Sequence, residues 1–272
     1  MLKRLGSAAA LFGLDLRKAA RALRGVGPFV RNRREYRQKS AGGAAGSEFP
    51  FGKLYPCLAD RFEESGVATG HYFHQDLLVA QRVFELSPRR HVDVGSRVDG
   101  FVAHVAAFRQ IDVFDIRALR TSSRNITFHQ RDLMEDRPDL DGCTDSLSCL
   151  HTLEHFGLGR YGDPVRPEGY RVGWRNLWRM LEPGGVLHLS VPIGPQRVEY
   201  DAHRVFAVPF VVEMAEGGGT GGGGERLYEI ERMSYIDDAG ELHVGVDWRG
   251  EAANKSFGCV YGCGVWEMRK KA

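Results

Sequence analysis

The segment SCLHTLEHFGLGRYGDP (148–164) carries two histidines and a glutamate that could do chemistry in either of two ways. His151, Glu154 and His155 form an H-x-x-E-H array, which on a long helix turns both histidines toward one zinc ion, with the glutamate as base. On a loop, the same side chains could instead take a proton from a bound substrate. Glycines follow almost at once and leave no room for a helix of several turns. We therefore expect a substrate loop here and no metal.

A fourth candidate base is His203 in EYDAHRVF (199–206), after the last strand of the alternating region. Each of these histidines could equally make a structural hydrogen bond or lie on a solvated loop. As catalytic candidates we take His155 and His203 first, with Glu154 and His151 beside them.

Acidic residues and glycines mark a second candidate site at the ends of three expected strands. Asp93 and Gly95 lie in DVGSRVDG (93–100), where a strand leads into a helix whose N-terminus favours a carboxylate or phosphate. Asp115 lies 20 residues beyond Gly95, where an acid accepts both hydroxyls of a ribose. Asp132 ends the next strand, placed to meet an exocyclic amine. These acids share the carboxyl edge of a parallel sheet, where α/β folds bind ligands; taken singly, each could merely cap a turn.

Strand and helix alternate along the middle of the chain, which predicts a mostly parallel sheet with helices on both faces. Short apolar segments predict strands at 91–96, 111–116, 126–132, 145–150 and 186–192. Helical spacing predicts helices at 72–87, 101–109 and 170–181, the last closed by EPGG (182–185). The tail changes character and predicts antiparallel strands around DDAG (237–240).

Composition places the chain among ordinary globular proteins, with 43% hydrophobic and 26% charged residues in 272. Residues 1–40 carry eleven Lys/Arg against two acids, a local charge of +9. We expect a basic N-terminal arm over 1–47, partly helical or disordered, and one α/β domain over 48–272. The glycine-rich stretch 217–224 reads as a flexible insert in that domain.

The basic arm could lie on the cytoplasmic face of an anionic membrane, or could be a solvated leader or a helix packed on the domain. No secretory signal and no apolar run of bilayer length is visible, and the five cysteines form no C-x-x-C pair. We therefore expect a cytoplasmic protein, with peripheral contact to the inner face of the membrane as one alternative.

Several of these segments, taken in order, resemble the motifs of the class I S-adenosylmethionine-dependent methyltransferases over roughly residues 70–210. They are HVDVGSRVDGF (91–101), VFDIRAL (113–119), HQRDL (129–133), DSLSCLHTLEHF (145–156) and NLWRMLEPGGVLHLSVP (176–192). More narrowly, residues 52–84 and 95–105 resemble an uncharacterised methyltransferase-like family often associated with bacterial surface-polysaccharide and glycan biosynthesis.

The resemblance implies a Rossmann-like, seven-stranded sheet with a C-terminal antiparallel hairpin and S-adenosyl-L-methionine as cofactor. It implies a methionine-side loop at the first strand, an acid for the ribose, an adenine wall and a segment that closes over the cofactor. The residues carried over are Asp93, Gly95, Ser96, Arg97, Gly100, Asp115, Ile116, Asp132, Leu133, Cys149, Leu150 and His151.

One departure concerns the glycine loop, where Arg97 and Asp99 replace the second and third glycines and Gly100 is shifted by one. Arg97 could pair with the cofactor's carboxylate or could crowd the site. The resemblance thus implies a methyltransferase that acts by O- or N-methyl transfer on a small molecule or a sugar or glycan intermediate. The alternative is a degenerate methyltransferase-like binding or scaffold protein. Nucleic acid is an unlikely partner because no reading module is recognisable, and the sequence does not indicate the oligomeric state.

Overall fold

The computed structural model describes residues 15–41, 48–217 and 226–271. Most of the glycine-rich stretch (217–224) and the first 14 residues of the predicted arm lie outside these ranges. Contacts divide the chain into two units, Met1–Val67 and Ala68–Ala272. The second unit holds the whole sheet and every candidate site residue.

The first unit is built on one long helix, α2 (Leu16–Ser40), with a short 3-10 turn, η1 (Asp60–Phe62). Asp15 caps α2, because its side chain accepts hydrogen bonds from the backbone N–H groups of Arg17 and Lys18, each at 2.9 Å. The segment after the helix returns along it, and a Cβ at Gly25 would meet the Leu58 carbonyl oxygen at 1.9 Å. Only glycine allows this close approach.

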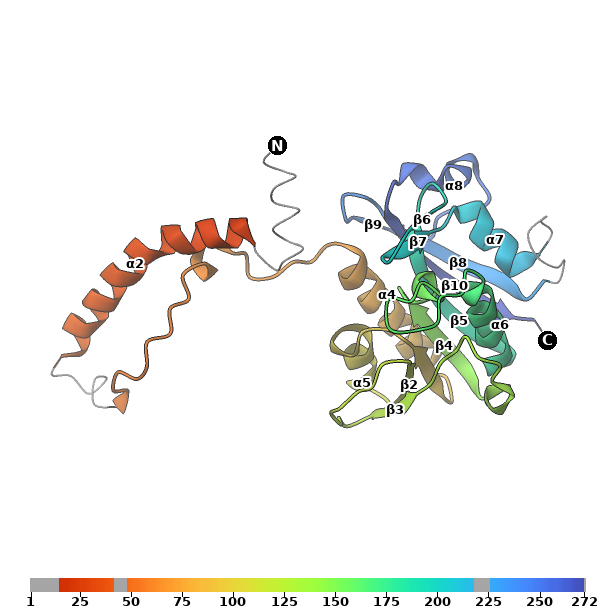
Figure 1. Cartoon of the computed structure of the whole chain (residues 1–272), viewed down its shortest axis with the longest axis horizontal. Coiled ribbons are helices and arrows are strands. Elements are labelled where there is room, and N and C mark those ends of the chain that lie inside the picture. The colour runs from red at the N-terminus through yellow and green to blue at the C-terminus, as the bar shows by residue number, and fades with distance from the viewer. Residues whose placement is uncertain (1–14, 42–47, 218–225, 272) are drawn as a thin grey trace. The chain divides into compact units, whose positions relative to one another are not determined.

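The second unit contains one large sheet in the order β3-β2-β1-β4-β5-β10-β8-β9 (Figure 1). Five neighbouring strands run parallel, and β10 runs antiparallel to both β5 and β8. The strands are β1 (His91–Val94), β2 (Ile111–Asp115), β3 (Ile126–Gln130), β4 (Thr144–Leu150), β5 (Leu181–Ile193), β8 (Tyr228–Ile236), β9 (Leu242–His243) and β10 (Gly262–Lys270). A separate hairpin pairs β6 (Arg197–Glu199) with β7 (His203–Val205).

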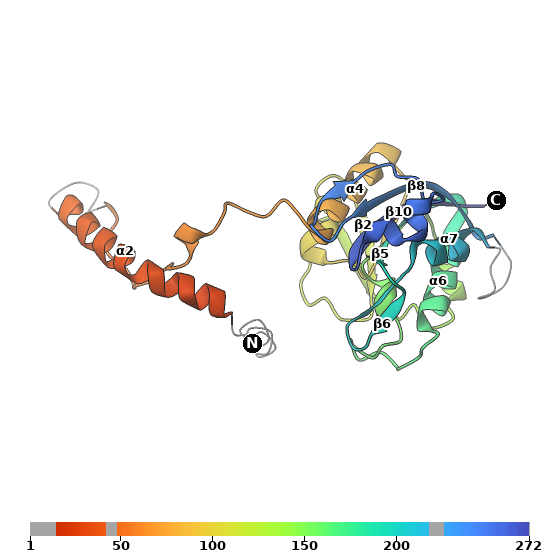
Figure 2. The same cartoon turned by 90° about the horizontal axis from the view of Figure 1, so that it is seen from above.

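Helices cover both faces of this sheet (Figure 2). They are α4 (His71–Leu86), α5 (Ala103–Ala106) preceded by a π-helical turn η2 (Val98–Val102), α6 (Gly169–Met180), α7 (Val208–Glu216) and α8 (Glu251–Asn254). Short 3-10 turns are η3 (Pro138–Leu140), η4 (Leu153–His155) and η5 (Ser256–Gly258).

Two hydrophobic clusters lie on opposite faces of the sheet. One packs α4 and the η2–α5 segment against β2 through side chains such as Val83, Phe101 and Ile111. The other packs α6 and α7 against the remaining face, with Leu177 and Trp266 fully buried. Because both faces are covered, the central strands β1 and β4 are buried along nearly their whole length, although they carry polar side chains such as Asp93 and Ser148.

The expected α/β architecture is confirmed, with a mostly parallel sheet and an antiparallel C-terminal region. The expected strand number is wrong, since the large sheet that the described residues form has eight strands rather than seven. The extra strand, β9, is two residues long and extends the edge beyond β8 after the DDAG turn (237–240). The helix expected at 101–109 begins within the π-helical turn η2, and its α-helical part, α5, is only four residues long. Among the described helices, none is both long and apolar enough to cross a bilayer.

Candidate functional site

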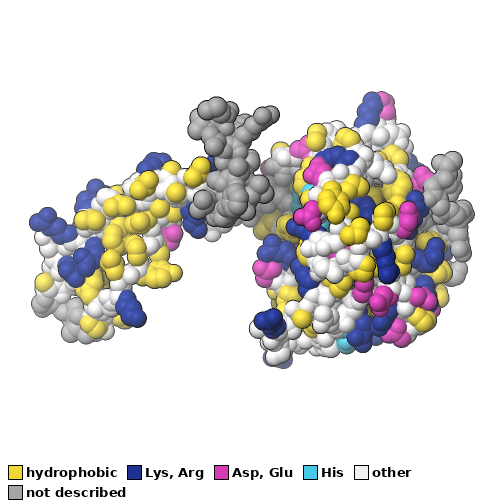
Figure 3. Space-filling model, in the orientation of Figure 1, with side chains coloured by type: hydrophobic (Ala, Val, Ile, Leu, Met, Phe, Trp, Pro, Cys, Tyr) yellow, Lys and Arg dark blue, Asp and Glu magenta, His cyan; other side chains and the backbone are white. Residues whose placement is uncertain are grey.

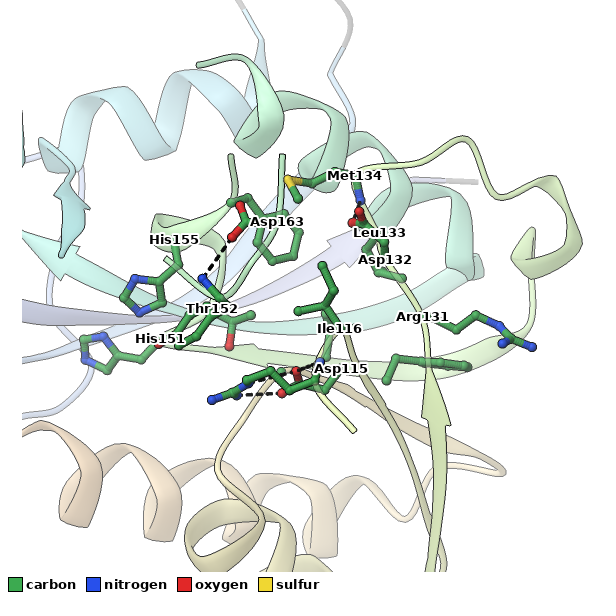
Figure 4. Close-up of a pocket in the computed structure, with 16 residues that line it drawn as sticks. Asp115, Ile116, Arg131, Asp132, Leu133, Met134, His151, Thr152, His155 and Asp163 are labelled. Carbon is green, nitrogen blue, oxygen red and sulfur yellow. Dashed lines mark hydrogen bonds and ion pairs between the residues drawn. The ribbon is translucent and has the colours of Figure 1, made fainter. Parts of the chain in front are cut away.

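A cleft with about 540 Å³ of empty space opens at the carboxyl edge of the parallel strands (Figure 4). It lies where the chain order of the sheet reverses, between β1 and β4, which is where open α/β sheets bind ligands. The residues that line it are Val94, Gly95, Phe114, Asp115, Ile116, Arg117, Arg131, Asp132, Leu133, Met134, His151, Thr152, His155, Phe156, Tyr161 and Asp163. The cleft thus combines apolar walls with a few polar groups, as small-molecule sites do.

The turn after β1 is held by Asp93, which is fully buried beneath the cleft. Its carboxylate accepts hydrogen bonds from the Ser96 backbone N–H at 3.0 Å and from the Ser96 and Ser148 hydroxyls, each at 2.6 Å. Burial raises the pKa of Asp93 to about 7, although these hydrogen bonds oppose the rise. Asp93 and Ser96 therefore build the turn rather than line the cleft.

Gly95 is the residue of this turn that faces the cleft. Its φ of +72° is left-handed, and a Cβ there would lie 2.3 Å from the Thr152 side chain. Both the backbone conformation and the approach of the loop after β4 therefore require glycine at this position.

The altered part of the glycine loop points away from the cleft. Arg97 pairs with Asp99 through two hydrogen bonds of 3.0 and 2.8 Å, and its guanidinium lies 5.5 Å from the Tyr72 ring centroid. Gly100 faces α4, where a Cβ would meet a carboxylate oxygen of Asp76 at 2.5 Å. Arg97 and Gly100, which are expected to contact the cofactor, therefore do not line the cleft. Arg97 and Asp99, which replace the loop glycines, instead pair with each other on the surface.

Two other predicted cofactor residues, Cys149 and Leu150, are also absent from the cleft wall. They end β4, where successive side chains point to opposite faces of the sheet. Cys149 is buried in the cluster beneath α6 and α7, and Leu150 in the cluster beneath α4. Both side chains are core residues.

Asp115 ends β2 at the middle of the cleft and already has a partner. Arg117 donates to it from Nε at 3.0 Å, from Nη2 at 2.7 Å and from its backbone N–H at 2.8 Å. The Arg117 guanidinium also lies 4.5 Å from the ring centroid of Tyr161. This ion pair raises the pKa of Arg117, against the effect of its burial. Both residues line the cleft, and Figure 4 shows Asp115 below Ile116, across the cleft from Asp132.

Asp132 sits after β3 on the opposite wall from Asp115, next to Leu133 and Met134 (Figure 4). Its Oδ1 accepts a hydrogen bond from the Met134 backbone N–H at 2.8 Å, which leaves Oδ2 without a partner in that turn. The buried Asn176 of α6 fixes the same turn by donating to the Leu133 carbonyl at 2.8 Å.

The H-x-x-E-H segment is not a long helix, because η4 is a three-residue 3-10 turn. Glu154 is buried and lies between the two histidines. Its Oε1 is 2.7 Å from His151 Nδ1 and 3.7 Å from His155 Nε2. His151 and His155 lie side by side at one end of the cleft (Figure 4). Glu154 therefore supports both rings from below and does not itself reach the cleft.

The protonation of His155 follows from its hydrogen bond. Its Nδ1 is 2.7 Å from the Ala202 carbonyl oxygen, so Nδ1 carries the proton and Nε2 has a free lone pair. Burial lowers the pKa of His155, although Glu154 opposes this effect. The neutral ring is thus suited to accept a proton at Nε2 near neutral pH.

His203 does not line the cleft. It begins β7, with Nε2 3.2 Å from Glu199 and its ring 4.8 Å from that of Tyr261. Burial lowers its pKa. Of the four candidate bases, His151 and His155 reach the cleft, whereas Glu154 lies behind them and His203 lies outside.

Sequence reasoning missed several cleft residues, chiefly Arg117, Tyr161 and Asp163. Asp163 shapes the loop that presents Tyr161: its carboxylate accepts from the backbone N–H groups of Gly157, Gly159 and Tyr161 at 3.1–3.2 Å. The repeated glycines of FGLGRYGD (156–163) were a signal for such a folded loop, because all three adopt positive φ.

Comparison with known proteins supports the fold and leaves the activity open. A family model described as "Caenorhabditis protein of unknown function, DUF268" matches residues 114–217, less than half of the chain. No curated protein shows significant sequence similarity to the chain.

Solved structures of similar fold include the [4+2]-cyclase SpnF, with a TM-score of 0.50 at 16% identity, covering 79% of this chain and 82% of that one. The N-methyltransferase NodS from Bradyrhizobium japonicum WM9, in complex with S-adenosyl-L-homocysteine, gives 0.47 at 13% identity, covering 75% and 89%. A Burkholderia thailandensis 1,6-didemethyltoxoflavin-N1-methyltransferase gives 0.43 at 13%, covering 73% and 79%. At 16% identity, the likeness to SpnF shows a shared Rossmann-like fold and no more.

Proposed function

We propose that this protein is an S-adenosylmethionine-dependent methyltransferase that acts on a small molecule or a sugar or glycan intermediate. The observation that carries the proposal is the cleft itself. Gly95, Asp115 and Asp132, from the ends of three successive strands, line one cavity at the point where the strand order reverses.

The chemistry of the cleft fits the proposed cofactor. Asp115 has the two carboxylate oxygens that a ribose diol requires, and Asp132 offers an acceptor for an exocyclic amine. Ile116, Leu133 and Met134 provide apolar surface between them for a planar base. When bound, S-adenosylmethionine supplies an electrophilic methyl group. The protein's own part is then to orient the acceptor and to receive its proton.

His155 is the residue best placed to receive that proton. Its Nδ1 is held by the Ala202 carbonyl, and its Nε2 lone pair is at the end of the cleft. Glu154, 3.7 Å from Nε2, would stabilise the imidazolium that forms. We assign His151, Glu154 and His203 no direct proton transfer, since His151 is almost fully buried, Glu154 lies behind the two histidines and His203 does not line the cleft.

The alternative is a binding or scaffold protein without methyl transfer. Two observations favour it: Arg117 occupies both oxygens of Asp115, and Arg97 and Asp99 replace loop glycines. SpnF, described as a cyclase, has a similar fold, so the fold alone does not fix the reaction.

A calorimetric titration with S-adenosylmethionine and S-adenosylhomocysteine tests whether the protein binds the proposed cofactor. We expect micromolar binding that Asp115→Asn weakens at least tenfold, because a ribose diol loses its charged acceptor. The matched control is Asp112→Asn, the same change on the same strand, at a residue that pairs with Arg90 away from the cleft. Absence of binding to the folded wild type, or equal loss in both variants, would contradict the proposed cofactor.

The acceptor is then sought by transfer of a labelled methyl group to nucleotide sugars, glycans and small hydroxylated or amino compounds. A product that appears only with cofactor-competent protein supports the enzyme. Cofactor binding with no transfer to any of these classes would favour the binding protein.

We also propose that the first unit contacts an anionic membrane surface. The α2 helix carries nine Lys/Arg against Glu35 alone, and apolar side chains such as Leu23, Val26 and Val30 are exposed on it. Figure 3 shows hydrophobic side chains gathered along this unit, with basic ones beside them. This pattern suits contact with an anionic, cytoplasmic membrane face.

Vesicle sedimentation tests the membrane contact. Replacing Arg31, Arg33 and Arg34 with Gln should weaken binding to phosphatidylserine vesicles by about 3 kcal/mol, roughly 100-fold, at about 1 kcal/mol per charge. The same replacement of Arg120, Arg124 and Arg175, exposed in the second unit, should have little effect. Equal losses in both variants, or equal binding to neutral vesicles, would count against the contact.

A further inference from the structure

Three residues from distant parts of the chain meet behind the cleft: His71, His151 and Cys263. His71 begins α4, His151 follows β4, and Cys263 lies on β10. One ring nitrogen of each histidine and the Cys263 sulfur all lie within 4.8 Å of one another. Among the described residues this is the one such group of histidine, cysteine and acidic side chains.

Each histidine has one nitrogen oriented by an acceptor, which is the arrangement around metal-ligating imidazoles. His151 Nδ1 donates to the buried Glu154 carboxylate at 2.7 Å. The backbone of Tyr261 hydrogen-bonds to the His71 ring. In both rings the other nitrogen is left for a ligand.

His151 Nε2 has no partner outside this cluster. The His151 side chain is only 4% exposed, and among the described residues its buried Nε2 has no hydrogen-bond partner apart from the Cys263 thiol. A buried polar atom of this kind calls for an explanation, and an ion is one of the few. The backbone of His151 is also strained, with a φ of +49°, and is held there by the Ser190 hydroxyl and carbonyl, both 3.0 Å from its N–H.

We propose that His71, His151 and Cys263 bind one zinc ion. Thiolate and imidazole together are the ligand types that zinc prefers, and three protein ligands leave a fourth position for water or another small ligand. In a tetrahedral site with bonds of about 2.0–2.3 Å, ligand atoms lie roughly 3.3–3.6 Å apart. The ligand atoms, which lie up to 4.8 Å apart, would have to move closer together. The His71 and His151 rings, stacked with 6° between their planes, would also have to turn so that both lone pairs meet at the ion.

This site differs from the zinc array considered in the sequence, with which it shares His151 alone. His155 is not part of it, since its Nδ1 donates to the Ala202 carbonyl and its ring nitrogens do not lie among the three clustered ligand atoms. Bound zinc would tie the start of α4 and strand β10 to the loop that forms one end of the cleft. The inference does not depend on the proposed methyl transfer, because binding of the ion needs neither cofactor nor acceptor.

Metal content and cobalt substitution test the site in the full-length protein. Protein produced with added zinc should carry about one equivalent, measured by mass spectrometry, and lose it to a strong chelator. Cobalt(II) added to the chelated protein should produce a near-ultraviolet thiolate-to-cobalt charge-transfer band and the visible bands of a tetrahedral ion. Zinc should restore the melting temperature that chelation lowers.

The variants have matched controls. Cys263→Ser should abolish the charge-transfer band, whereas Cys259→Ser, at another buried cysteine, should keep it. His71→Asn should weaken metal binding at least tenfold, whereas His74→Asn, one helical turn on, should not. Glu154→Gln should weaken it about 10- to 100-fold as a positioning residue. A folded wild type without stoichiometric metal, or a band that survives Cys263→Ser, would overturn the site.

Discussion

The Arg117 guanidinium holds the Asp115 carboxylate by both of its oxygens, at 3.0 and 2.7 Å, in the middle of the cleft. A ribose that approached Asp115 would have to share or displace this partner. The ion pair therefore competes with the ribose for Asp115 in the proposed cofactor site. The free energy of this competition can be measured.

Removing the arginine should make the acid easier to reach. We expect Arg117→Met to tighten S-adenosylhomocysteine binding about two- to fivefold, because opening a half-exposed ion pair costs roughly 0.5–1 kcal/mol. Calorimetry at low and high salt measures the effect, which should shrink as salt screens the pair in the wild type. Weaker binding by Arg117→Met would instead mean that the arginine stays and contacts the ligand.

Asp93 should make the protein less stable as the pH rises. Its folded-state pKa of about 7 is above the ordinary value of 3.8, so the folded state holds a proton that the unfolded state releases between these values. Relative to Asp93→Asn, the wild type should lose about 4 kcal/mol of unfolding free energy from pH 4 to pH 7, at about 1.4 kcal/mol per pKa unit. Urea unfolding across this range measures it. Parallel pH profiles for both proteins would show that Asp93 is already ionised at low pH.

His155 should affect catalysis and not cofactor affinity. His155→Gln should lower kcat by roughly 10²- to 10⁴-fold, the usual contribution of a general base, and leave the S-adenosylmethionine Kd within about twofold. Because burial lowers the pKa of His155, the rate should stay level down to about pH 6.5 and fall only below it. His203→Gln is the comparison, since His203 lies outside the cleft. Equal rate losses in both variants would remove His155 as the specific base.

Gly95 should tolerate no side chain, for two separable reasons. Gly95→Ala and Gly142→Ala both force a positive φ on alanine, which costs about 1–2 kcal/mol. Only at Gly95 does the new Cβ also strike Thr152, whereas Gly142 has open space around it. We expect Gly95→Ala to lose about 1–3 kcal/mol more in denaturant unfolding. Equal losses would show that the Thr152 loop can move aside.

Much of the fold could be predicted because its signals are local. The strands β1, β2 and β4 are short segments with turn residues at their ends, and their carboxyl ends must share one edge of a parallel sheet. That rule predicts that Gly95, Asp115 and Asp132 lie close together. The two-residue strand β9 was missed because so short an edge carries no periodicity.

The site was predicted less completely, because its other contacts depend on which partner each side chain turns to. Whether Arg97 turns to a ligand or to Asp99 depends on packing that spacing does not specify. Cys149 and Leu150 are expected to close over the cofactor, but their side chains lie in the core, because alternation at the end of β4 directs them to the two covered faces of the sheet. Cys263 is far from His71 and His151 in the sequence, and only the position of β10 in the sheet brings it to them.

That position of β10 has a consequence for biosynthesis. The strand lies between β5 and β8, both of which precede it in the chain, and it hydrogen-bonds to each along most of its length. Until the residues up to Lys270 have left the ribosome, β5 and β8 each present an unpaired edge, and the fully buried Trp266 is missing from the core. The nascent second unit should therefore complete its sheet only once β10 has emerged, and should depend on chaperone protection until then.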